Sequence, residues 1–120
     1  MSDDPERRIR RGDVFWVATQ TDAVPHPHVV VQDDLFNRSR VHTVVVCGLS
    51  SNLRRASEPG NVLLEPGEGG LPKQSVVIVS QIDAVLRQRL GERIGALSAA
   101  RVEQVLDGLR FQQRAFFRDD

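Results

Sequence analysis

HPHVVVQDD (residues 26–34) and TVVV (residues 43–46) are the two strand-forming runs that decide the fold of this chain. The first is entered through two histidines and left through a polar turn, and the second ends in SSN (residues 50–52) and an arginine pair, Arg54 and Arg55. β-Branched residues favour extended structure, so we expect two strands that pair. Imidazoles, hydroxyls and guanidiniums would then gather at the strand ends. Cleavage of a phosphodiester without a metal uses these groups.

Further apolar runs on both sides of this pair predict a sheet of several strands. We expect strands over residues 13–18, 29–32, 41–47, 61–64 and 75–79, and shorter extended pieces over residues 84–86 and 92–97. Residues 19–25 and the glycine-rich residues 66–72 are expected to be loops, and residues 50–55 a short helical turn capped by Ser50 or Ser51. Because no long helix separates the strands, the pattern favours a small, strongly bent antiparallel sheet or barrel.

The C-terminal part of the chain changes to a helical period. Ser98 is a candidate N-cap, and Leu97 and Val102 are spaced for a hydrophobic staple across it. The residues spaced to form one apolar face are Val102, Val105, Leu106 and Leu109. The helix is expected to lie across the sheet and to run to about Phe116 or Phe117. The predicted fold is therefore mainly β with a C-terminal helix.

Length and composition predict one domain, which we place at residues 11–118 behind a flexible polar tail at residues 1–10. The N-terminus lacks the apolar core of a secretory signal, and no stretch is apolar enough for a membrane span, so a cytoplasmic location is expected. A single cysteine, Cys47, excludes an intrachain disulfide and a multi-cysteine zinc site. Its apolar surroundings predict a buried thiol.

The formal net charge is zero, which argues against a protein that coats nucleic acid nonspecifically. Lys73 is the only lysine, and every other basic residue is arginine. Arginine binds phosphate bidentately and stacks on bases, so local clusters suit RNA. A GC-rich genome explains the same bias equally well.

His26 and His28 are the candidate proton-transfer groups. An imidazole titrates near neutral pH, and two of them on one face of an extended segment could divide the roles of acid and base. The alternative is that both are loop-edge histidines without chemistry. A metal site that also uses His42 is disfavoured, because no carboxylate ligands accompany the histidines in a metal-binding spacing.

The other polar candidates each have a structural alternative. Ser50 and Ser51 would hydrogen-bond a phosphate or cap a turn, and Asn52 would read a base edge or finish that turn. Gln81 would donate its amide to RNA or satisfy nearby backbone groups. Trp16 is expected in the core or in a dimer interface.

Arg38, Arg54 and Arg55 would hold phosphates or form a solvated patch, and since Arg54 and Arg55 are adjacent, one of them is expected to face solvent. Asp33 and Asp34 are expected on opposite sides of the chain, a poor geometry for a two-metal nuclease.

Several motifs occur in a fixed order before the C-terminal helix. They are RGDV (residues 11–14), HPHVVVQDDLFNRS (26–39), VVVCGLSSNL (44–53), GLPKQSVV (70–77), and SQI (80–82) ahead of Arg89-Leu90. In this order and spacing the chain resembles the MazF/PemK family of toxin endoribonucleases from toxin–antitoxin systems.

The resemblance implies an SH3-like or CcdB-like barrel with a C-terminal helix, acting as a homodimer. It implies sequence-specific cleavage of single-stranded RNA without a metal or other cofactor. The ribose 2′-OH would attack the adjacent phosphate, giving a cyclic or 3′ phosphate and a 5′ hydroxyl. It also implies silencing by an antitoxin protein that occupies the RNA groove.

The chain departs from this family at its chemical centre. The usual arginine ahead of the second strand falls on His26, and the usual catalytic threonine falls on Ser50. An acidic residue common before the Gln-Ile pair falls on Ser80, and an arginine common after it falls on Asp83. By position, the resemblance assigns catalysis to His26 and Ser50, and His28 joins them as the second imidazole. The predicted RNA-binding residues are Arg38, Ser51, Asn52, Arg54, Arg55 and Gln81.

Three other functions are compatible with the predicted fold. A member that has lost turnover through the arginine replacement would be a protein-binding or RNA-binding module. A gyrase inhibitor of the CcdB kind would need a C-terminal Trp-Gly-Ile, whereas this chain ends in FFRDD (residues 116–120). A barrel that binds proline-rich peptides would need exposed aromatic rows, which so few aromatic residues do not suggest.

Overall fold

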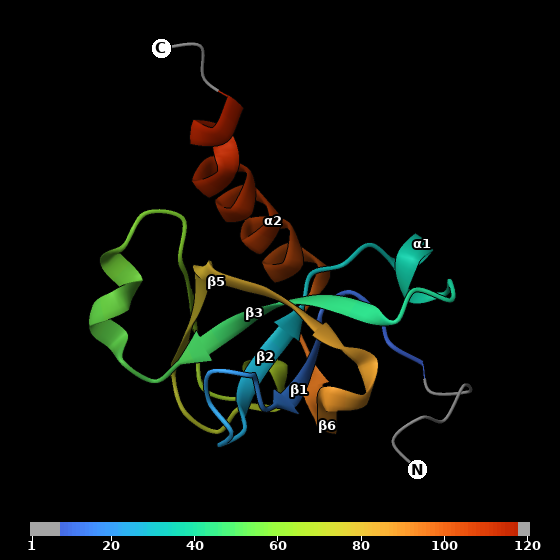
Figure 1. Ribbon diagram of the computed structural model, residues 1–120. Helices are drawn as coiled ribbons and strands as arrows, with labels where there is room; N and C mark the ends of the chain where they lie inside the picture. Colours follow the sequence, from blue (N-terminus) through green and yellow to red (C-terminus); the bar gives the residue numbers. More distant parts are fainter. Residues whose placement is uncertain (1–7, 118–120) are drawn as a thin grey trace.

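The computed structural model describes residues 8–117 of the chain (Figure 1). The strands of this part are β1 (Asp13–Val17), β2 (His26–Val30), β3 (Thr43–Ser50), β4 (Val62–Leu64), β5 (Ser75–Leu86) and β6 (Leu90–Ala96). The α-helices are α1 (Asp34–Asn37) and α2 (Ala99–Gln113), and the short 3₁₀ helices are η1 (Leu53–Ser57), η2 (Glu68–Gly70), η3 (Arg87–Arg89) and η4 (Arg114–Phe117).

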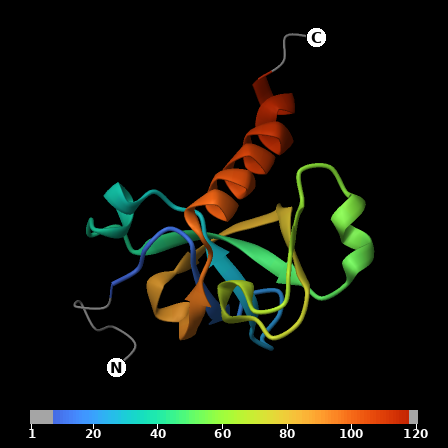
Figure 2. The ribbon, with the colours of Figure 1, turned by 180° about the vertical axis from the view of Figure 1, so that it is seen from behind.

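The strands form one antiparallel sheet in the order β4-β5-β3-β2-β1-β6. The predicted pairing of the two valine runs is confirmed, since β2 pairs with β3. The sheet is not closed by hydrogen bonds, but the segment that contains η2 packs against β6 and narrows the gap between the two edge strands (Figure 2). The prediction of a mainly β, strongly bent sheet with a C-terminal helix is confirmed, and its barrel is an open one.

A bulge in β5 produces the sharpest bend of the sheet. Cys47 of β3 pairs with Ile82, whereas its neighbour Gly48 pairs with Ile78, so residues 79–81 have no partner on β3. The strand turns there and continues to Leu86. The prediction of separate extended pieces at 75–79 and 84–86 was wrong, because the bulge absorbs the bend without breaking the strand.

Apolar residues fill both faces of the sheet. One cluster lies between the sheet and α2 and contains Val14, Val29 and Cys47, while the other contains Phe15 and Val30. Strand β3 contributes to both clusters, with Cys47 and Leu49 in the first and Val44 and Val46 in the second. Of the tail predicted at residues 1–10, residues 1–7 lie outside the described part of the chain, whereas Ile9 is buried in the second cluster. Trp16 is 41% exposed and so lies outside the core, which leaves a dimer interface as the remaining prediction for it.

Helix α2 begins and ends close to the predicted positions. The Ser98 hydroxyl accepts a hydrogen bond from the Arg101 N–H, which confirms the predicted N-cap. The predicted apolar face packs on the sheet, and the helical segment continues through η4 to Phe117. Arg101 also pairs with Glu68 of η2 at 2.9 Å, which ties the helix to the β4–β5 connection.

Strand boundaries around the valine runs differ from the prediction. β2 starts three residues earlier, at His26, because Pro25 and Pro27 hold the chain extended there. β3 continues to Ser50, so the predicted helical turn over residues 50–55 is instead η1, which begins at Leu53 and is capped by Asn52. Within the described part of the chain, no helix is both long and apolar enough to cross a membrane.

Candidate active site

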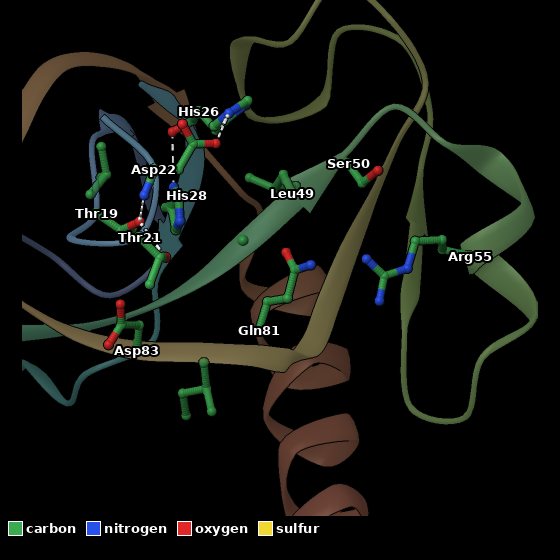
Figure 3. Close-up of a pocket in the computed structure, with 13 residues that line it drawn as sticks. Thr19, Thr21, Asp22, His26, His28, Leu49, Ser50, Arg55, Gln81 and Asp83 are labelled. Carbon is green, nitrogen blue, oxygen red and sulfur yellow. Dashed lines mark hydrogen bonds and ion pairs between the residues drawn. The ribbon is translucent and has the colours of Figure 1, made fainter. Parts of the chain in front are cut away.

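A pocket of about 500 Å³ lies where β2 begins, β3 ends and β5 bends (Figure 3). Antiparallel pairing brings these places together, since His28 is opposite Gly48 and Gly48 is opposite Ile78. The residues that line it are Val17, Thr19, Thr21, Asp22, His26, His28, Gly48, Leu49, Ser50, Arg55, Gln81, Ile82 and Asp83. The pocket therefore gathers two imidazoles, a guanidinium, an amide and several hydroxyls.

Both predicted histidines lie at this pocket, and each ring is held by a different partner. The Nε2 atom of His26 lies 2.8 Å from a carboxylate oxygen of Asp22, and the Nδ1 atom of His28 lies 2.9 Å from the His26 carbonyl oxygen. A carbonyl only accepts, so His28 donates from Nδ1 and its Nε2 carries the lone pair. Burial lowers the pKa of His28 below its ordinary value, which keeps this ring neutral at neutral pH.

Ser50 and Gln81 supply neutral hydrogen-bonding groups to the same pocket. The Ser50 hydroxyl oxygen accepts from the Asn52 N–H at 3.0 Å, which leaves its O–H free to donate. The Gln81 side chain lies over Gly48, in the middle of the group drawn in Figure 3. In the described part of the chain it makes no hydrogen bond, so the alternative in which this amide satisfies nearby backbone groups is not observed.

Arg55 and Asp83 place opposite charges on the pocket wall. Arg55 is held by Glu58 at 3.1 Å, and Glu58 also accepts from Asn61. This pair lowers the pKa of Glu58 and fixes the guanidinium at the pocket rather than in solvent. Asp83 lines the side nearer to His28 and attracts its protonated form. The site is thus cationic at one end and acidic at the other.

Other predicted residues lie outside the pocket. Arg54 is exposed beside Arg55, which confirms that the pair diverges, and Ser51 is exposed as well. The Asn52 side chain accepts from the Arg54 N–H and caps η1, which is the turn-finishing alternative. Arg38 lies at the end of α1, beyond the opposite end of β2, so it does not join Arg55.

Histidine, cysteine and acidic side chains do not gather into one cluster in the described part of the chain. Among residues 8–117, no group of three or more histidine, cysteine or acidic side chains is placed to hold a metal ion. Asp33 and Asp34 are used structurally, Asp33 as the cap of α1 and Asp34 as an acceptor for the Arg11 N–H. Cys47 is buried as predicted, and burial raises the pKa of its thiol to about 12.

Sequence reasoning missed Asp22 and the Thr19 and Thr21 hydroxyls. All three lie in the loop between β1 and β2, and only the folded loop turns them toward the histidines. The available signal was the spacing of Asp22 four residues before His26 in a segment whose prolines restrict the chain. Gly48 was also missed, although a glycine inside an apolar strand run often marks a close approach.

Comparison with protein families gives a match over nearly the whole described chain. The family described as PemK-like, MazF-like toxin of type II toxin–antitoxin system matches residues 10–112. Endoribonuclease MazF6 of Mycobacterium tuberculosis is 34% identical over 107 residues, which cover 85% of this chain and 94% of that protein. Endoribonuclease EndoA of Bacillus subtilis is 27% identical over 108 residues, covering 85% and 91%.

Solved structures give the same fold. An endoribonuclease from a mycobacterial species, in complex with its cognate antitoxin, superposes with a TM-score of 0.73 at 21% identity, covering 86% of this chain and 92% of that one. MazF from Deinococcus radiodurans superposes with a TM-score of 0.73 at 18% identity, covering 91% and 99%.

Proposed function

Because the chain belongs to the PemK-like, MazF-like family of toxins of type II toxin–antitoxin systems, we propose that it is an endoribonuclease that cleaves single-stranded RNA at a specific sequence without a metal. The relatives named above as endoribonucleases match most of its length. The observation that supports this activity best is the meeting of His26, His28, Ser50 and Gln81 on one pocket. We place the activity in the cytoplasm.

The proposed reaction is an attack by the ribose 2′-OH on the adjacent phosphate, which gives a cyclic or 3′ phosphate and a 5′ hydroxyl. His26 and His28 would transfer the protons. The free O–H of Ser50 and the unengaged amide of Gln81 would donate to phosphate oxygens, whose negative charge grows in the transition state. Arg55 would hold the phosphate electrostatically while it remains paired with Glu58.

RNA beyond the reacting phosphate would follow the rim of the pocket. Ser51, Asn52 and Arg54 lie in the segment between Ser50 and Arg55, which line the pocket, and are exposed, so we propose that they contact neighbouring nucleotides. Arg38 is too far along the sheet to belong to this set. As partners we propose a second copy of the chain and an antitoxin protein, the latter because a structural neighbour is in complex with its cognate antitoxin.

The test is cleavage of a long single-stranded RNA by the purified protein in excess EDTA, beside the His26→Ala and Ser50→Ala variants. We expect cuts at one short motif, lost or strongly reduced in both variants while their circular dichroism stays unchanged. His42→Ala is the matched control, because it removes an exposed histidine that does not line the pocket. Intact RNA with well-folded wild-type protein would contradict the proposal and favour a binding module without turnover.

A further inference from the structure

The loop before β2 presents a carboxylate to His26, and this contact has a consequence for the reaction. We propose that Asp22 is a positioning residue, which holds His26 so that it donates a proton to the leaving oxygen. In this proposal, which rests on the proposed cleavage of RNA, His28 acts as the base. The two histidines are neighbours on one strand, yet the structure gives them different partners and therefore different roles.

Both oxygens of the Asp22 carboxylate are engaged. Oδ1 accepts from the Val24 N–H at 3.0 Å, and Oδ2 lies 2.8 Å from Nε2 of His26. The backbone of Asp22 is fixed as well, since its N–H donates to the Thr19 hydroxyl and its carbonyl accepts from the Thr19 N–H. The hydrogen bonds from Val24 and His26 lower the pKa of Asp22, so it is ionised at neutral pH. The loop thus aims a fixed anion at one nitrogen of His26.

This contact selects the reactive atom of His26. An ionised carboxylate only accepts, so Nε2 of His26 carries a proton and Nδ1 is the nitrogen left for substrate. Carboxylate-held histidines in hydrolases use the same orienting effect.

The hydrogen bonds of His28 suit it to accept a proton, whereas those of His26 suit it to donate one. Its Nδ1 donates to the His26 carbonyl, which leaves the Nε2 lone pair as the acceptor, and burial favours its neutral form. A neutral imidazole beside a carboxylate-held one provides a base and an acid at the same pH. The other charged groups on the pocket wall are Asp83 on β5 and Arg55 on η1.

In the resulting step, each histidine transfers one proton. Nε2 of His28 takes the proton from the 2′-OH as the bond from O2′ to phosphorus forms. The bond from phosphorus to O5′ breaks, and Nδ1 of His26 gives its proton to O5′. The products are a 2′,3′-cyclic phosphate and a 5′ hydroxyl, with His28 protonated and His26 neutral. Exchange with solvent restores the starting protonation.

Asp22→Asn is the decisive variant, because asparagine keeps the Oδ1 acceptor for Val24 but places an amide N–H₂ where His26 needs an acceptor. We expect its single-turnover cleavage rate to fall by about 10²-fold, the lower end of typical general-acid effects. The acid limb of its pH–rate profile, which deprotonation of His28 sets, should stay where it is in the wild type. Asp107→Asn is the matched control, because Asp107 is exposed and pairs with Arg110 outside the pocket.

A second substrate separates positioning from folding. A nucleoside 3′-(p-nitrophenyl phosphate) has a leaving group that departs without a proton, so Asp22→Asn and His26→Ala should approach the wild-type rate on it, whereas His28→Ala should remain slow. Equal RNA cleavage by Asp22→Asn and wild type, or an equal defect on both substrates, would overturn the inference.

The test stays informative if the proposed function fails. Should wild-type protein leave RNA intact, ¹⁵N NMR of the imidazoles still reports the arrangement. The Nε2–H form of His26 should dominate in the wild type and be lost in Asp22→Asn, and an unchanged tautomer would refute the role of Asp22.

Discussion

Gly48 and Gln81 approach so closely that a Cβ on Gly48 would lie 2.6 Å from the Gln81 side-chain oxygen. The contact exists because the β5 bulge brings Gln81 over β3 just where β3 has no side chain. The absence of a side chain at position 48 therefore determines where the Gln81 amide lies in the pocket.

Gly48→Ala should displace the Gln81 amide and lower RNA cleavage by about 10-fold, since small misplacements at a reacting centre have effects of this size or larger. Unfolding free energy should change little, because only the end of a flexible side chain has to move. A double-mutant cycle with Gln81→Ala measures the coupling, and strictly additive effects would show that position 48 acts by another route.

Local signals were sufficient to predict most elements. β-Branched runs marked β1, β3 and β5, and the Ser98 cap with its apolar period marked α2. The bulge at residues 79–81 was not predictable in this way, because Ser80 and Gln81 are polar and look like the end of a strand. Only the pairing with β3 shows that the strand continues through them.

The site residues that strand pairing brings together could be predicted from the sequence, whereas those that a loop positions could not. Antiparallel pairing of β2 with β3 puts Ser50 near His26, and the same pairing sends Arg38 to the far end. Grouping Arg38 with Arg55 overlooked this geometry. Asp22 reaches His26 only through the contacts that Thr19 makes inside the β1–β2 loop, and no periodicity encodes these.

Burial of His28 should make stability depend on pH near neutrality. Its pKa is lowered in the folded protein from the ordinary 6.5, so the unfolded chain binds a proton at a higher pH than the folded protein does. The stabilisation from His28 is complete above pH 6.5 and is lost as the pH falls from there toward the folded-state pKa, at no more than about 1.4 kcal/mol per pH unit. Urea unfolding between pH 5 and about pH 8 measures this slope.

His28→Asn should remove this component of the slope, because its amide replaces the Nδ1 donor and does not titrate. His42→Asn, at an exposed position, is the control for loss of a histidine as such. Identical slopes for wild type and His28→Asn would show that His28 titrates alike in the folded and unfolded states.

Cys47 should be inert to alkylation in the folded protein. Its side chain is inaccessible within the core cluster beneath α2, and burial raises its pKa to about 12, so almost no thiolate forms at pH 8. Mass spectrometry after iodoacetamide treatment should show no adduct until urea is added. Ser51→Cys supplies an exposed thiol as the positive control. Rapid labelling of native wild type would mean that the core opens around Cys47.

Gly108 should resist the substitution that normally stabilises a helix. It lies inside α2, where alanine is favoured over glycine by about 1 kcal/mol, but its Cβ would overlap the Gly60 carbonyl oxygen and press on Val79. We expect Gly108→Ala to lower the unfolding free energy by about 1–3 kcal/mol, as overpacking does in other cores.

Position 103 provides the matched comparison, since Glu103 is exposed on the same helix. There Glu103→Ala should be more stable than Glu103→Gly by about 1 kcal/mol, which is the intrinsic helix preference for alanine over glycine where no neighbour interferes. Urea unfolding of the wild type, Gly108→Ala, Glu103→Ala and Glu103→Gly gives the difference in unfolding free energy between alanine and glycine at each position. Opposite signs at the two positions would establish that the close approach of Gly60 dictates glycine at 108, whereas stabilisation by Gly108→Ala would show that the loop yields and that the contact is not tight in solution.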